Sequence, residues 1–398
     1  PDSVNWNGGN APTLANGDDA DDAQQFQFIT RDSGLTWYGW EPYSYDAPYR
    51  DLFGWGDNGS GGLGQNNTIQ YSSPIQIDGS TWNGSKMDNG SHAADMIKTD
   101  GTLWTWGHGV YGQHGHNNAD GISSPMQLPG SYSDVSGGYY ITSAIKTDGT
   151  LWTMGDNRKG ELGQNNKTSY SSPMQVGTDT TWQACQSDAY MMMASKTNGT
   201  LWTWGRNVSG GLGQNQPTGT YRSSPTQVGT DTTWGSNLGS AFYNFSANKT
   251  DGTMWIWGRG DTGAIGDGAG VNRSSPIQLP GSWSKLAGGY YAYYIATKTD
   301  GTLWSWGYGD QGNLGHNNRT QYNSPKQIPG TNWSDCTGGS QLGAAIKTDG
   351  TMWAWGNNTQ GFLGQNNKTS YSSPVQIPGT KWSKVDSMIG PVFATKTP

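Results

Sequence analysis

Short runs of alternating hydrophobic and polar residues recur along this chain, and most of them flank an Asp-Gly or Asn-Gly dipeptide. In residues 144–152, for example, two such runs lie on either side of Asp148 and Gly149. This pattern predicts two antiparallel strands joined by a tight turn, and the Asp-Gly pair favours a turn of type I′. No long stretch has the spacing of an amphipathic helix. The pattern therefore predicts an all-β protein.

One phrase repeats through the chain. It reads Lys-Thr-Asp-Gly-Thr-Leu-Trp-Thr-Trp-Gly at residues 98–107. A shorter copy lies near residues 52–56. Closely similar copies lie near residues 146–155, 196–205, 249–258, 298–307 and 347–356. The period of about fifty residues is that of a propeller blade. Seven copies predict a seven-bladed β-propeller over residues 36–398.

The two ends of the repeat region carry complementary halves of the phrase. Residues 393–397 read Phe-Ala-Thr-Lys-Thr, which is the first half of the hairpin without the second. Residues 52–56 carry the second half without the first. Pairing the two halves completes one blade and removes two exposed strand edges. We therefore expect a ring that is closed by strands from both termini.

The first part of the chain lacks the repeat. An acidic run occupies residues 18–22, and aromatic residues gather at 37–49. We expect an extended N-terminal arm over residues 1–35, followed by a strand-like lead into the ring at 36–51. Such an arm either contacts a neighbouring subunit or forms a flexible terminus.

Composition narrows the class of protein. The chain has 398 residues, among them 62 Gly, 21 Trp and 20 Tyr, and its aromatic side chains can bury enough apolar area to argue against disorder. The formal net charge of −7 disfavours binding to the phosphates of nucleic acids. No apolar run is long enough for insertion into a membrane. No charged segment followed by an apolar one opens the chain, so we expect synthesis without a signal peptide.

The Trp and Cys residues have structural explanations. Most Trp occupy two positions of the repeat, within the phrase and at the start of the next strand, which predicts packing between blades. Cys185 and Cys336 each follow a repeat Trp by three residues, in a column that holds Val or Leu in other blades. The two Cys lie several blades apart, beyond the reach of a disulfide. We therefore expect two buried free thiols.

The motifs do not indicate a catalytic site or a metal site. His108, His114 and His116 share one loop, but no fourth ligand accompanies them and no other repeat contains the trio. The acidic run at 18–22 lacks the Gly and the distant Glu of a calcium loop. The sequence contains no nucleophile elbow, phosphate-binding loop or zinc-protease motif. We therefore expect no enzymatic activity, no cofactor and no bound metal.

Together these features resemble the regulator of chromosome condensation repeat family, a class of seven-bladed propellers. The resemblance rests on Trp106 and Gly107, on glycine-rich loops such as those that contain residues 213–214 and 364–365, and on the Ser-Ser-Pro segments that follow them. It covers about residues 50–398 and implies the propeller fold. The family includes nuclear exchange factors for small GTPases, secreted inhibitors that cap an enzyme, and photoreceptors. Family resemblance therefore implies no single function.

One column of the repeat differs from blade to blade and predicts the binding site. It lies about seven and six residues before each repeat Lys, near the end of the expected inner strand, and four neighbouring blades carry aromatic residues there. The candidate residues are Tyr139, Tyr140, Tyr190, Phe242, Tyr243, Tyr290, Tyr291 and His92. The aromatic side chains either pack locally under loops or form an arc on one face of the ring, where Tyr is a favoured contact residue. In the resembled family this column commonly holds a ligand-facing His, and His92 matches that pattern.

We interpret the chain as a non-enzymatic binding or structural propeller. Its near-identical repeats and its polar surface, rich in Asn, Gln, Ser, Thr and Gly, are similar to those of proteins displayed on virions. A phage tail or capsid-associated module that binds a receptor would be located on the virion or outside the cell. Its partner would be a protein or a cell-surface glycan. Two alternatives stay open: a secreted protein that caps or inhibits an enzyme, and a small-GTPase exchange factor, which the acidic N-terminus disfavours.

Overall fold

The structure of this chain is a computed structural model of an all-β protein. The residues that it describes are 28–30, 37–39, 50–79, 81–387 and 389–397. The chain consists of two compact units, Pro1–Ala47 and Pro48–Pro398. No helix occurs in the described part of either unit, which agrees with the alternating pattern of the sequence.

The first unit contains one described pair of strands. Strand β1 (Phe28–Thr30) runs antiparallel to β2 (Trp37–Gly39), and Ile29 lies opposite Tyr38. The expected arm over 1–35 and its boundary with the ring fall largely on residues outside those that the structure describes. That division of the chain therefore stays a prediction.

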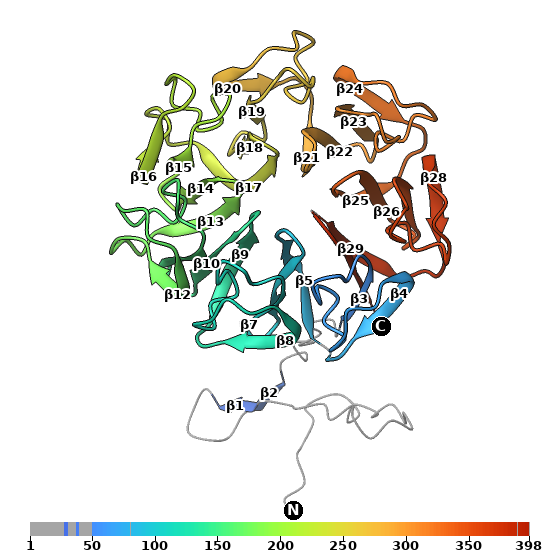
Figure 1. Cartoon of the computed structure of the whole chain (residues 1–398), viewed down its shortest axis with the longest axis horizontal. Coiled ribbons are helices and arrows are strands. Elements are labelled where there is room, and N and C mark those ends of the chain that lie inside the picture. Colours follow the sequence, from blue (N-terminus) through green and yellow to red (C-terminus); the bar gives the residue numbers. More distant parts are fainter. Residues whose placement is uncertain (1–27, 31–36, 40–49, 80, 388, 398) are drawn as a thin grey trace, which may run out of the picture. The chain divides into compact units, whose positions relative to one another are not determined.

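The second unit is a ring of four-stranded antiparallel sheets, of which the described residues form seven. Figure 1 shows these sheets as blades around a central axis. Blade 1 has the strand order β29-β30-β3-β4, and blades 2 to 7 each take four consecutive strands, from β5–β8 to β25–β28. The seven-bladed propeller predicted from the repeats is confirmed.

The four strands of a blade are ordered from the axis outward. The innermost strands are β29 (Trp382–Ser387), β5 (Trp82–Asn89), β9 (Tyr132–Gly137), β13 (Trp182–Ser187), β17 (Trp234–Ala241), β21 (Trp283–Gly289) and β25 (Trp333–Gly338). The second strands are β30 (Val392–Lys396), β6 (Ala93–Lys98), β10 (Ile141–Lys146), β14 (Met191–Lys196), β18 (Asn244–Lys249), β22 (Tyr293–Lys298) and β26 (Leu342–Lys347). The third strands are β3 (Asp51–Gly56), β7 (Leu103–Gly107), β11 (Leu151–Gly155), β15 (Leu201–Arg206), β19 (Met254–Gly258), β23 (Leu303–Gly307) and β27 (Met352–Gly356). The outer strands are β4 (Tyr71–Ile77), β8 (Ile122–Leu128), β12 (Tyr170–Gln175), β16 (Tyr221–Gln227), β20 (Arg273–Leu279), β24 (Tyr322–Ile328) and β28 (Tyr371–Ile377).

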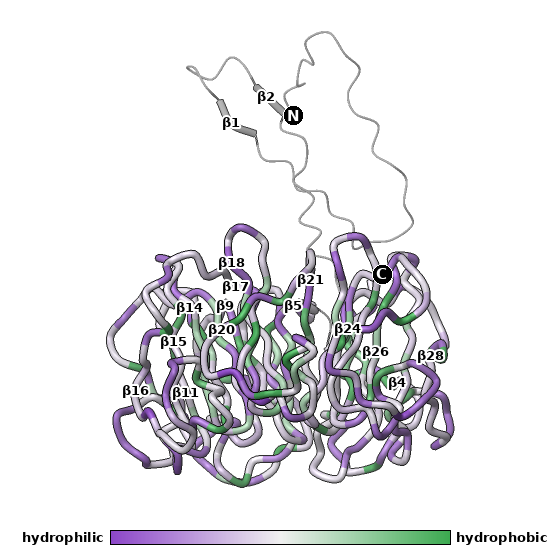
Figure 2. The backbone as a smooth tube through the Cα atoms, turned by 90° about the horizontal axis from the view of Figure 1, so that it is seen from above, coloured by the Kyte–Doolittle hydropathy of each residue, from purple (hydrophilic) through white to green (hydrophobic). Residues whose placement is uncertain are grey.

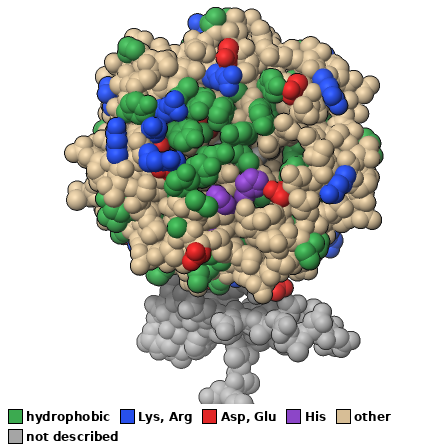
Figure 3. Space-filling view, in the orientation of Figure 1, with side chains coloured by type: hydrophobic (Ala, Val, Ile, Leu, Met, Phe, Trp, Pro, Cys, Tyr) green, Lys and Arg blue, Asp and Glu red, His purple; other side chains and the backbone are tan. Residues whose placement is uncertain are grey.

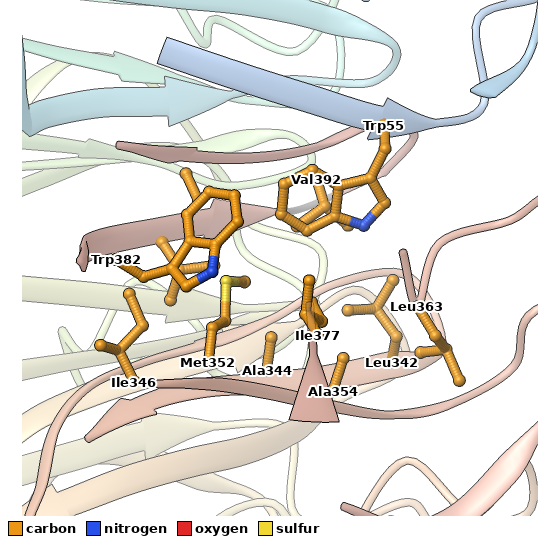
Figure 4. Packing of buried hydrophobic residues seen from close by; sticks show 12 residues of the cluster. Trp55, Leu342, Ala344, Ile346, Met352, Ala354, Leu363, Ile377, Trp382 and Val392 are labelled. Carbon is orange, nitrogen blue, oxygen red and sulfur yellow. The ribbon is translucent and has the colours of Figure 1, made fainter. Parts of the chain in front are cut away.

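Blade 1 joins the two ends of the repeat region. Strand β30 pairs antiparallel with β3, and Gly54 lies opposite Phe393. Trp55 and Trp382 of this blade point into a buried cluster that is completed by blade 7, as Figure 4 shows. The predicted closure by strands from both termini is therefore confirmed.

The repeated Trp side chains connect neighbouring blades. In six of the seven blades the last Trp of the phrase is fully buried, and its indole Nε1 donates a hydrogen bond to a backbone carbonyl in the loop of the preceding blade; blade 3 has Met154 at this position. These donor–acceptor pairs are Trp55–Phe362 (2.7 Å), Trp106–Gly62 (2.8 Å), Trp204–Glu161 (2.7 Å), Trp257–Gly211 (2.9 Å), Trp306–Ala264 (2.8 Å) and Trp355–Asn313 (2.8 Å). Each indole thus buries a large apolar area and satisfies its one donor. The predicted packing of Trp between blades is confirmed.

The hairpin turn between the second and third strands is not of the predicted type. In the turn 98–101, the N–H of Gly101 donates to the carbonyl of Lys98 (2.9 Å), and Gly101 has a φ of +83°. A type I′ turn requires a positive φ at the preceding residue as well, and Asp100 does not have one. Its Oδ1 instead accepts hydrogen bonds from the backbone N–H and the hydroxyl of Thr102 (2.9 and 2.7 Å). The type I′ prediction is wrong, because this Asp stabilises a type I turn that is followed by a left-handed Gly.

The repeat Lys packs between two aromatic rings near these turns. In blade 2, Lys98 Nζ lies 4.8 Å from the centre of the Trp82 ring and 4.4 Å from that of Trp104. The corresponding lysines of the other blades are Lys146, Lys196, Lys249, Lys298, Lys347 and Lys396. Cation–π attraction and burial of the aliphatic stem give this Lys a packing role.

The two Cys residues lie on innermost strands of different blades. Cys185 in β13 is 5% exposed, Cys336 in β25 is fully buried, and both are free thiols. Val135, Leu286 and Val385 occupy the same column in other blades and are buried too. The prediction that each Cys acts as a small buried hydrophobic residue is confirmed.

Figure 2 shows where polarity lies along the propeller. Hydrophobic positions concentrate along the strands, and hydrophilic positions concentrate in the loops at the two ends of the strands. The turns between first and second strands and the long loops between third and fourth strands lie at one end. The hairpin turns lie at the other end. Any surface built from residues that differ between blades is therefore a surface of loops and turns.

Candidate binding face at one end of the propeller

The predicted aromatic residues all lie in the turns that join the first strand of a blade to the second. Tyr139 and Tyr140 lie between β9 and β10, and Tyr190 lies between β13 and β14. The remaining four are Phe242 and Tyr243, between β17 and β18, and Tyr290 and Tyr291, between β21 and β22. Because these turns share one end of the ring, blades 3 to 6 present the seven side chains on the same face.

These side chains form a continuous network of ring contacts, which we call the aromatic surface. Its members are Tyr139, Tyr140, Tyr190, Phe242, Tyr243, Tyr290 and Tyr291. The ring centre of Tyr139 lies 4.1 Å from that of Tyr140 and 6.3 Å from that of Tyr190. Tyr139 also stacks on Tyr290 from blade 6, with ring centres 5.7 Å apart and an interplanar angle of 15°. The contact between blades 3 and 6 shows that the surface extends across the axis of the ring.

The side of the aromatic surface at blades 5 and 6 is built by three further contacts. The ring of Phe242 lies 4.7 Å from that of Tyr290, and that of Tyr243 lies 4.0 Å from that of Phe242. Tyr290 and Tyr291 are 5.2 Å apart, nearly perpendicular to each other. Such offset and edge-to-face arrangements are favourable for aromatic pairs.

The aromatic surface is half-buried. Tyr291 is 40% exposed, and the other six side chains are of intermediate exposure. Phe242 and Tyr243 also pack against the buried clusters beneath them, so the two alternatives weighed for these residues apply together. Figure 3 shows hydrophobic side chains gathered over the centre of this face, with several basic side chains on one side of them.

Four tyrosines of this surface are harder to ionise than a free tyrosine. The pKa of Tyr140 and that of Tyr290 lie well above the ordinary value, chiefly because burial penalises the phenolate and then because Tyr139 is close. Burial also raises the pKa of Tyr190 and of Tyr243. These four hydroxyl groups can donate and accept hydrogen bonds at neutral pH and well above it.

A buried carboxyl group supports the turn that carries Tyr243. This residue has a φ of +67°, a conformation that is uncommon for a bulky side chain. Its backbone N–H donates to Asp188 Oδ2 at 2.8 Å, and Asp188 is fully buried. Burial raises the pKa of Asp188 to about 7. The carboxyl group thus compensates a strained turn in the neighbouring blade.

A second variable column, which the sequence analysis did not identify, lies beside the aromatic column. The backbone N–H of the residue after a closing Gly donates to the backbone carbonyl of the last turn residue before the second strand. Arg206 donates in this way to Tyr190 (2.9 Å), and Arg259 donates to Tyr243 (3.1 Å). Across the blades this column holds Asp57, His108, Asp156, Arg206, Arg259, Tyr308 and Asn357. Its variation from repeat to repeat was the available signal. The closing Gly itself is required, since a Cβ at Gly205 would lie 2.4 Å from the Tyr190 carbonyl oxygen.

Two arginines extend the aromatic surface on the side of blades 3 and 4. The Arg158 guanidinium lies 4.7 Å above the Tyr111 ring, which is itself 4.4 Å from Tyr140. The Arg206 guanidinium lies 5.8 Å from the Tyr190 ring. Arginine stacks on aromatic faces and is enriched in protein interfaces, so both groups belong to the same candidate site.

His92 lies on the same face but apart from the aromatic rings. Its Nδ1 is 2.9 Å from Asp57 Oδ2, and the hydrogen bond from His92 lowers the pKa of Asp57. The backbone carbonyl of His92 accepts from the N–H of His108, whose ring lies 6.2 Å from Tyr140. His92 is therefore at the margin of the candidate site.

The three His residues that share one loop, His108, His114 and His116, form separate hydrogen bonds. His114 is buried and its Nε2 lies 3.0 Å from the carbonyl oxygen of Gly107, whereas His116 Nε2 lies 3.0 Å from Thr105 Oγ1. Burial lowers the pKa of His114 to about 4. Across the described ranges, no group of three or more His, Cys, Asp or Glu side chains has the spacing to hold a metal ion.

Two cavities lie elsewhere in the propeller, one at the axis and one between neighbouring blades. A polar one of about 250 Å³ lies between innermost strands at the axis and is lined by ion pairs such as Lys86–Asp134 (2.8 Å). The other, of about 500 Å³, is a crevice between blades 6 and 7 that is lined by Trp333, Trp353 and Lys347. The second cavity repeats a packing of Lys between two aromatic rings that recurs in every blade, so it does not distinguish one blade from the rest.

Comparison with known proteins identifies the repeat. The family model described as the regulator of chromosome condensation (RCC1) repeat matches residues 100–145, 148–186, 300–346 and 349–387. The chain contains RCC1 repeats. The stretch 187–299 lies outside these matches, and it holds five of the seven members of the aromatic surface. The two other members of this surface, Tyr139 and Tyr140, lie within the first match.

Solved structures share the fold of this RCC1-repeat propeller. Human WBSCR16 has a TM-score of 0.75 at 18% identity, covering 87% of this chain and 99% of that chain. Prp20p from Saccharomyces cerevisiae has a TM-score of 0.76 at 16% identity, covering 88% and 92%. Yeast RCC1 (Prp20) bound to Kap60 has a TM-score of 0.75 at 16% identity, covering 93% and 96%. At these identities the likeness establishes the fold alone.

A curated relative matches a short part of the RCC1-repeat propeller. A stretch of 80 residues is 32% identical to the E3 ubiquitin-protein ligase HERC2 of Homo sapiens, and equally to that of Mus musculus. It covers 20% of this chain, and the chain spans about 2% of the length of HERC2. Within the described residues, no helix combines the length and the apolar character needed to cross a membrane.

Proposed function

We propose that this RCC1-repeat propeller is a non-enzymatic module that binds a protein partner through the aromatic surface. The observation that carries the proposal is the continuous ring network from four consecutive blades, from Tyr140 through Tyr139 and Tyr290 to Tyr243. Blade packing does not require these rings, because blades 1, 2 and 7 lack them at the corresponding positions. A role outside the propeller explains their presence.

The chemistry of the surface fits a protein partner. Tyr and Arg are enriched where proteins meet. Tyr buries much area for few rotatable bonds and retains a polar group at its edge, and Arg offers a planar guanidinium with several donors. One structural relative, seen in two solved structures, supports this class of function by its own binding: yeast Prp20p was studied for its binding to Gsp1p and histones, and the same protein was crystallised with Kap60. A cell-surface glycan and a neighbouring subunit, contacted through the N-terminal arm, are further candidate partners.

The setting we propose is a virion, where the propeller would serve as a phage tail or capsid-associated receptor-binding module. This proposal rests on composition: near-identical repeats and 62 Gly in a polar, acidic chain. A secreted protein that caps an enzyme and a small-GTPase exchange factor are the alternatives. A purified small GTPase with bound nucleotide separates the last of these, because an exchange factor would accelerate release of the nucleotide. Imaging the native assembly separates the virion setting from the secreted one.

The aromatic surface is tested by comparing three immobilised full-length proteins: the unmodified chain, a Tyr190→Ala/Tyr243→Ala variant and a Met126→Ala variant. Met126 is the control, since it is 47% exposed on outer strand β8 of blade 2, outside the aromatic surface. A protein from the source organism qualifies as a partner when the unmodified chain and the control capture it and the double variant does not. We expect the double substitution to weaken that binding by about 1–4 kcal/mol, as for interface hot spots. Equal capture by all three proteins, at equal thermal stability, would refute the proposal.

A further inference from the structure

We propose that the segment of the partner that lies on the aromatic surface is acidic and extends over the loops of blades 3 and 4. This inference rests on the proposed function and adds the charge and direction of the partner. It starts from an uneven distribution of charge among the long loops on this face. Residues 156–169 and 206–222 contain five basic and two acidic residues. The corresponding loops of blades 1, 2, 6 and 7, taken together, contain two basic and three acidic residues.

This local excess of positive charge runs against the composition of the chain. The whole protein has a formal net charge of −7. One of the two acidic residues in the basic loops is Glu161, which is buried, and burial raises its pKa to about 7. The loops of blades 3 and 4 are therefore more basic at their surface than their composition alone indicates.

Arg158 is held in place for contact with a ligand. Asp156 accepts from its Nε at 2.9 Å and from its Nη2 at 2.8 Å, and the hydroxyl of Tyr111 accepts from Nη2 at 3.1 Å. The Arg158 side chain nevertheless stays 55% exposed. A guanidinium fixed over an aromatic ring loses little conformational entropy on binding, and its remaining donors face outward.

Arg206 provides the unpaired charge. Within the described part of the chain it forms no ion pair, and its guanidinium lies against Tyr190 of the aromatic surface. Farther out, Lys159 Nζ and Lys167 Nζ lie 5.8 and 5.3 Å from the ring of Tyr221. The basic groups thus continue from the aromatic surface toward the outer strand of blade 4.

This arrangement fits carboxylates that follow an apolar or aromatic contact. Arginine binds carboxylates through paired N–H donors, and a charge at the rim of an interface sets the association rate and its salt dependence. An acidic partner segment would place apolar side chains on the aromatic surface and carboxylates beside Arg206 and Arg158. A basic or neutral segment would leave the charge of Arg206 without compensation, whereas Arg158 is already paired with Asp156.

The test uses a short fluorescein-labelled peptide rich in Glu and Phe, together with the same peptide in which every Glu is Gln. Fluorescence anisotropy measures binding to the full-length chain at low and at high salt. The variants are Arg158→Gln/Arg206→Gln and, as a matched control, Arg319→Gln, which removes an exposed arginine from the corresponding loop of blade 6. We expect the acidic peptide to bind more tightly than the Gln peptide and its binding to weaken with salt. We expect the double variant to weaken binding by about fivefold or more and the control to leave it unchanged.

Each result separates the inference from the proposed function. Equal binding of both peptides, no effect of salt, or equal weakening by Arg319→Gln would overturn the acidic partner. If binding of both peptides is lost in Tyr190→Ala/Tyr243→Ala while the arginine variant binds normally, the aromatic surface stands and the acidic partner is refuted. If the tyrosine variant binds normally and the arginine variant does not, the acidic ligand stands and the aromatic surface is refuted. Thermal unfolding of each variant excludes loss of the fold as the cause.

Discussion

Replacing Phe393 by Ala is the sharpest test of how the ring is closed. Phe393 lies in β30, is fully buried, and contacts parts of the propeller that are distant in sequence. Its ring centre lies 5.9 Å from that of Trp106 in blade 2, perpendicular to it. It also covers Gly54 of β3, where a Cβ atom would lie 3.0 Å from the Phe393 ring. The side chain therefore connects the last strand, the first strand of the ring and the next blade.

The expected loss of stability follows from this burial. Truncation of a buried Phe to Ala costs about 3–5 kcal/mol, because apolar area is lost and a cavity remains. Phe393 is at 0% exposure between two sheets that cannot close the gap, so we expect about 4 kcal/mol or more. The same substitution at half-buried Phe242 removes less buried area and should cost about 1–2 kcal/mol.

Urea unfolding followed by tryptophan fluorescence measures both variants on the full chain. The difference between Phe393→Ala and Phe242→Ala isolates the closure, because the chemical change is the same. A cost below about 1 kcal/mol at Phe393, or an equal cost at both sites, would refute the argument that β30 is an integral strand of the ring. Deletion of residues 391–398 is the extreme case, and we expect it to destabilise the entire ring because it leaves β29 without a neighbouring strand and exposes one edge of β3.

Two further changes have expected outcomes. Asp188→Asn should remove a pH dependence: the folded-state pKa of about 7 exceeds the ordinary value of about 3.9, so the stability due to this proton is complete below about pH 4 and lost as pH rises through 7. Urea unfolding between pH 5 and 7 should show a slope that is shallower in the variant by up to about 1.4 kcal/mol per pH unit, and an unchanged slope would contradict the assignment. Trp204→Phe should cost about 1–3 kcal/mol more than Trp202→Phe, because the buried Glu161 carbonyl loses its donor; equal melting temperatures would contradict this.

The sequence was sufficient to predict the ring and its closure, because these depend on repetition. The half-phrases at 52–56 and 393–397 had no partner except each other, and a sheet edge is costly to leave open. The aromatic column was predicted for the same reason: residues that break a repeat are not needed by it. That Tyr190 and its neighbours lie on one face follows from their common place in the repeat.

Other features depended on curvature and burial, which a linear pattern does not contain. The stacking of Tyr139 on Tyr290 requires two blades to approach each other across the axis. The role of Asp188 requires knowledge that its carboxyl group is buried beneath the turn of the next blade. Arg206 follows a closing Gly, and its place in the candidate site depends on the backbone hydrogen bond that holds it beside Tyr190. The predicted turn type was wrong because the backbone conformation depends on the hydrogen bond that the Asp100 carboxylate accepts from Thr102, which the dipeptide pattern alone does not show.

Blade 1 contains strands from both ends of the repeat region, and this has a consequence for synthesis of the protein. Strands β3 and β4 are translated before the other strands of the ring, but their blade partners β29 and β30 are translated after all of them. Until then the nascent chain carries an open edge on β3, and unpaired edges are templates for aggregation. Blades 2 to 7 can form in order, whereas the ring becomes continuous only after β30 has left the ribosome. Chaperone protection during translation would therefore matter more for this chain than for a protein that folds in segments, and a product of premature termination would be an open arc instead of a smaller propeller.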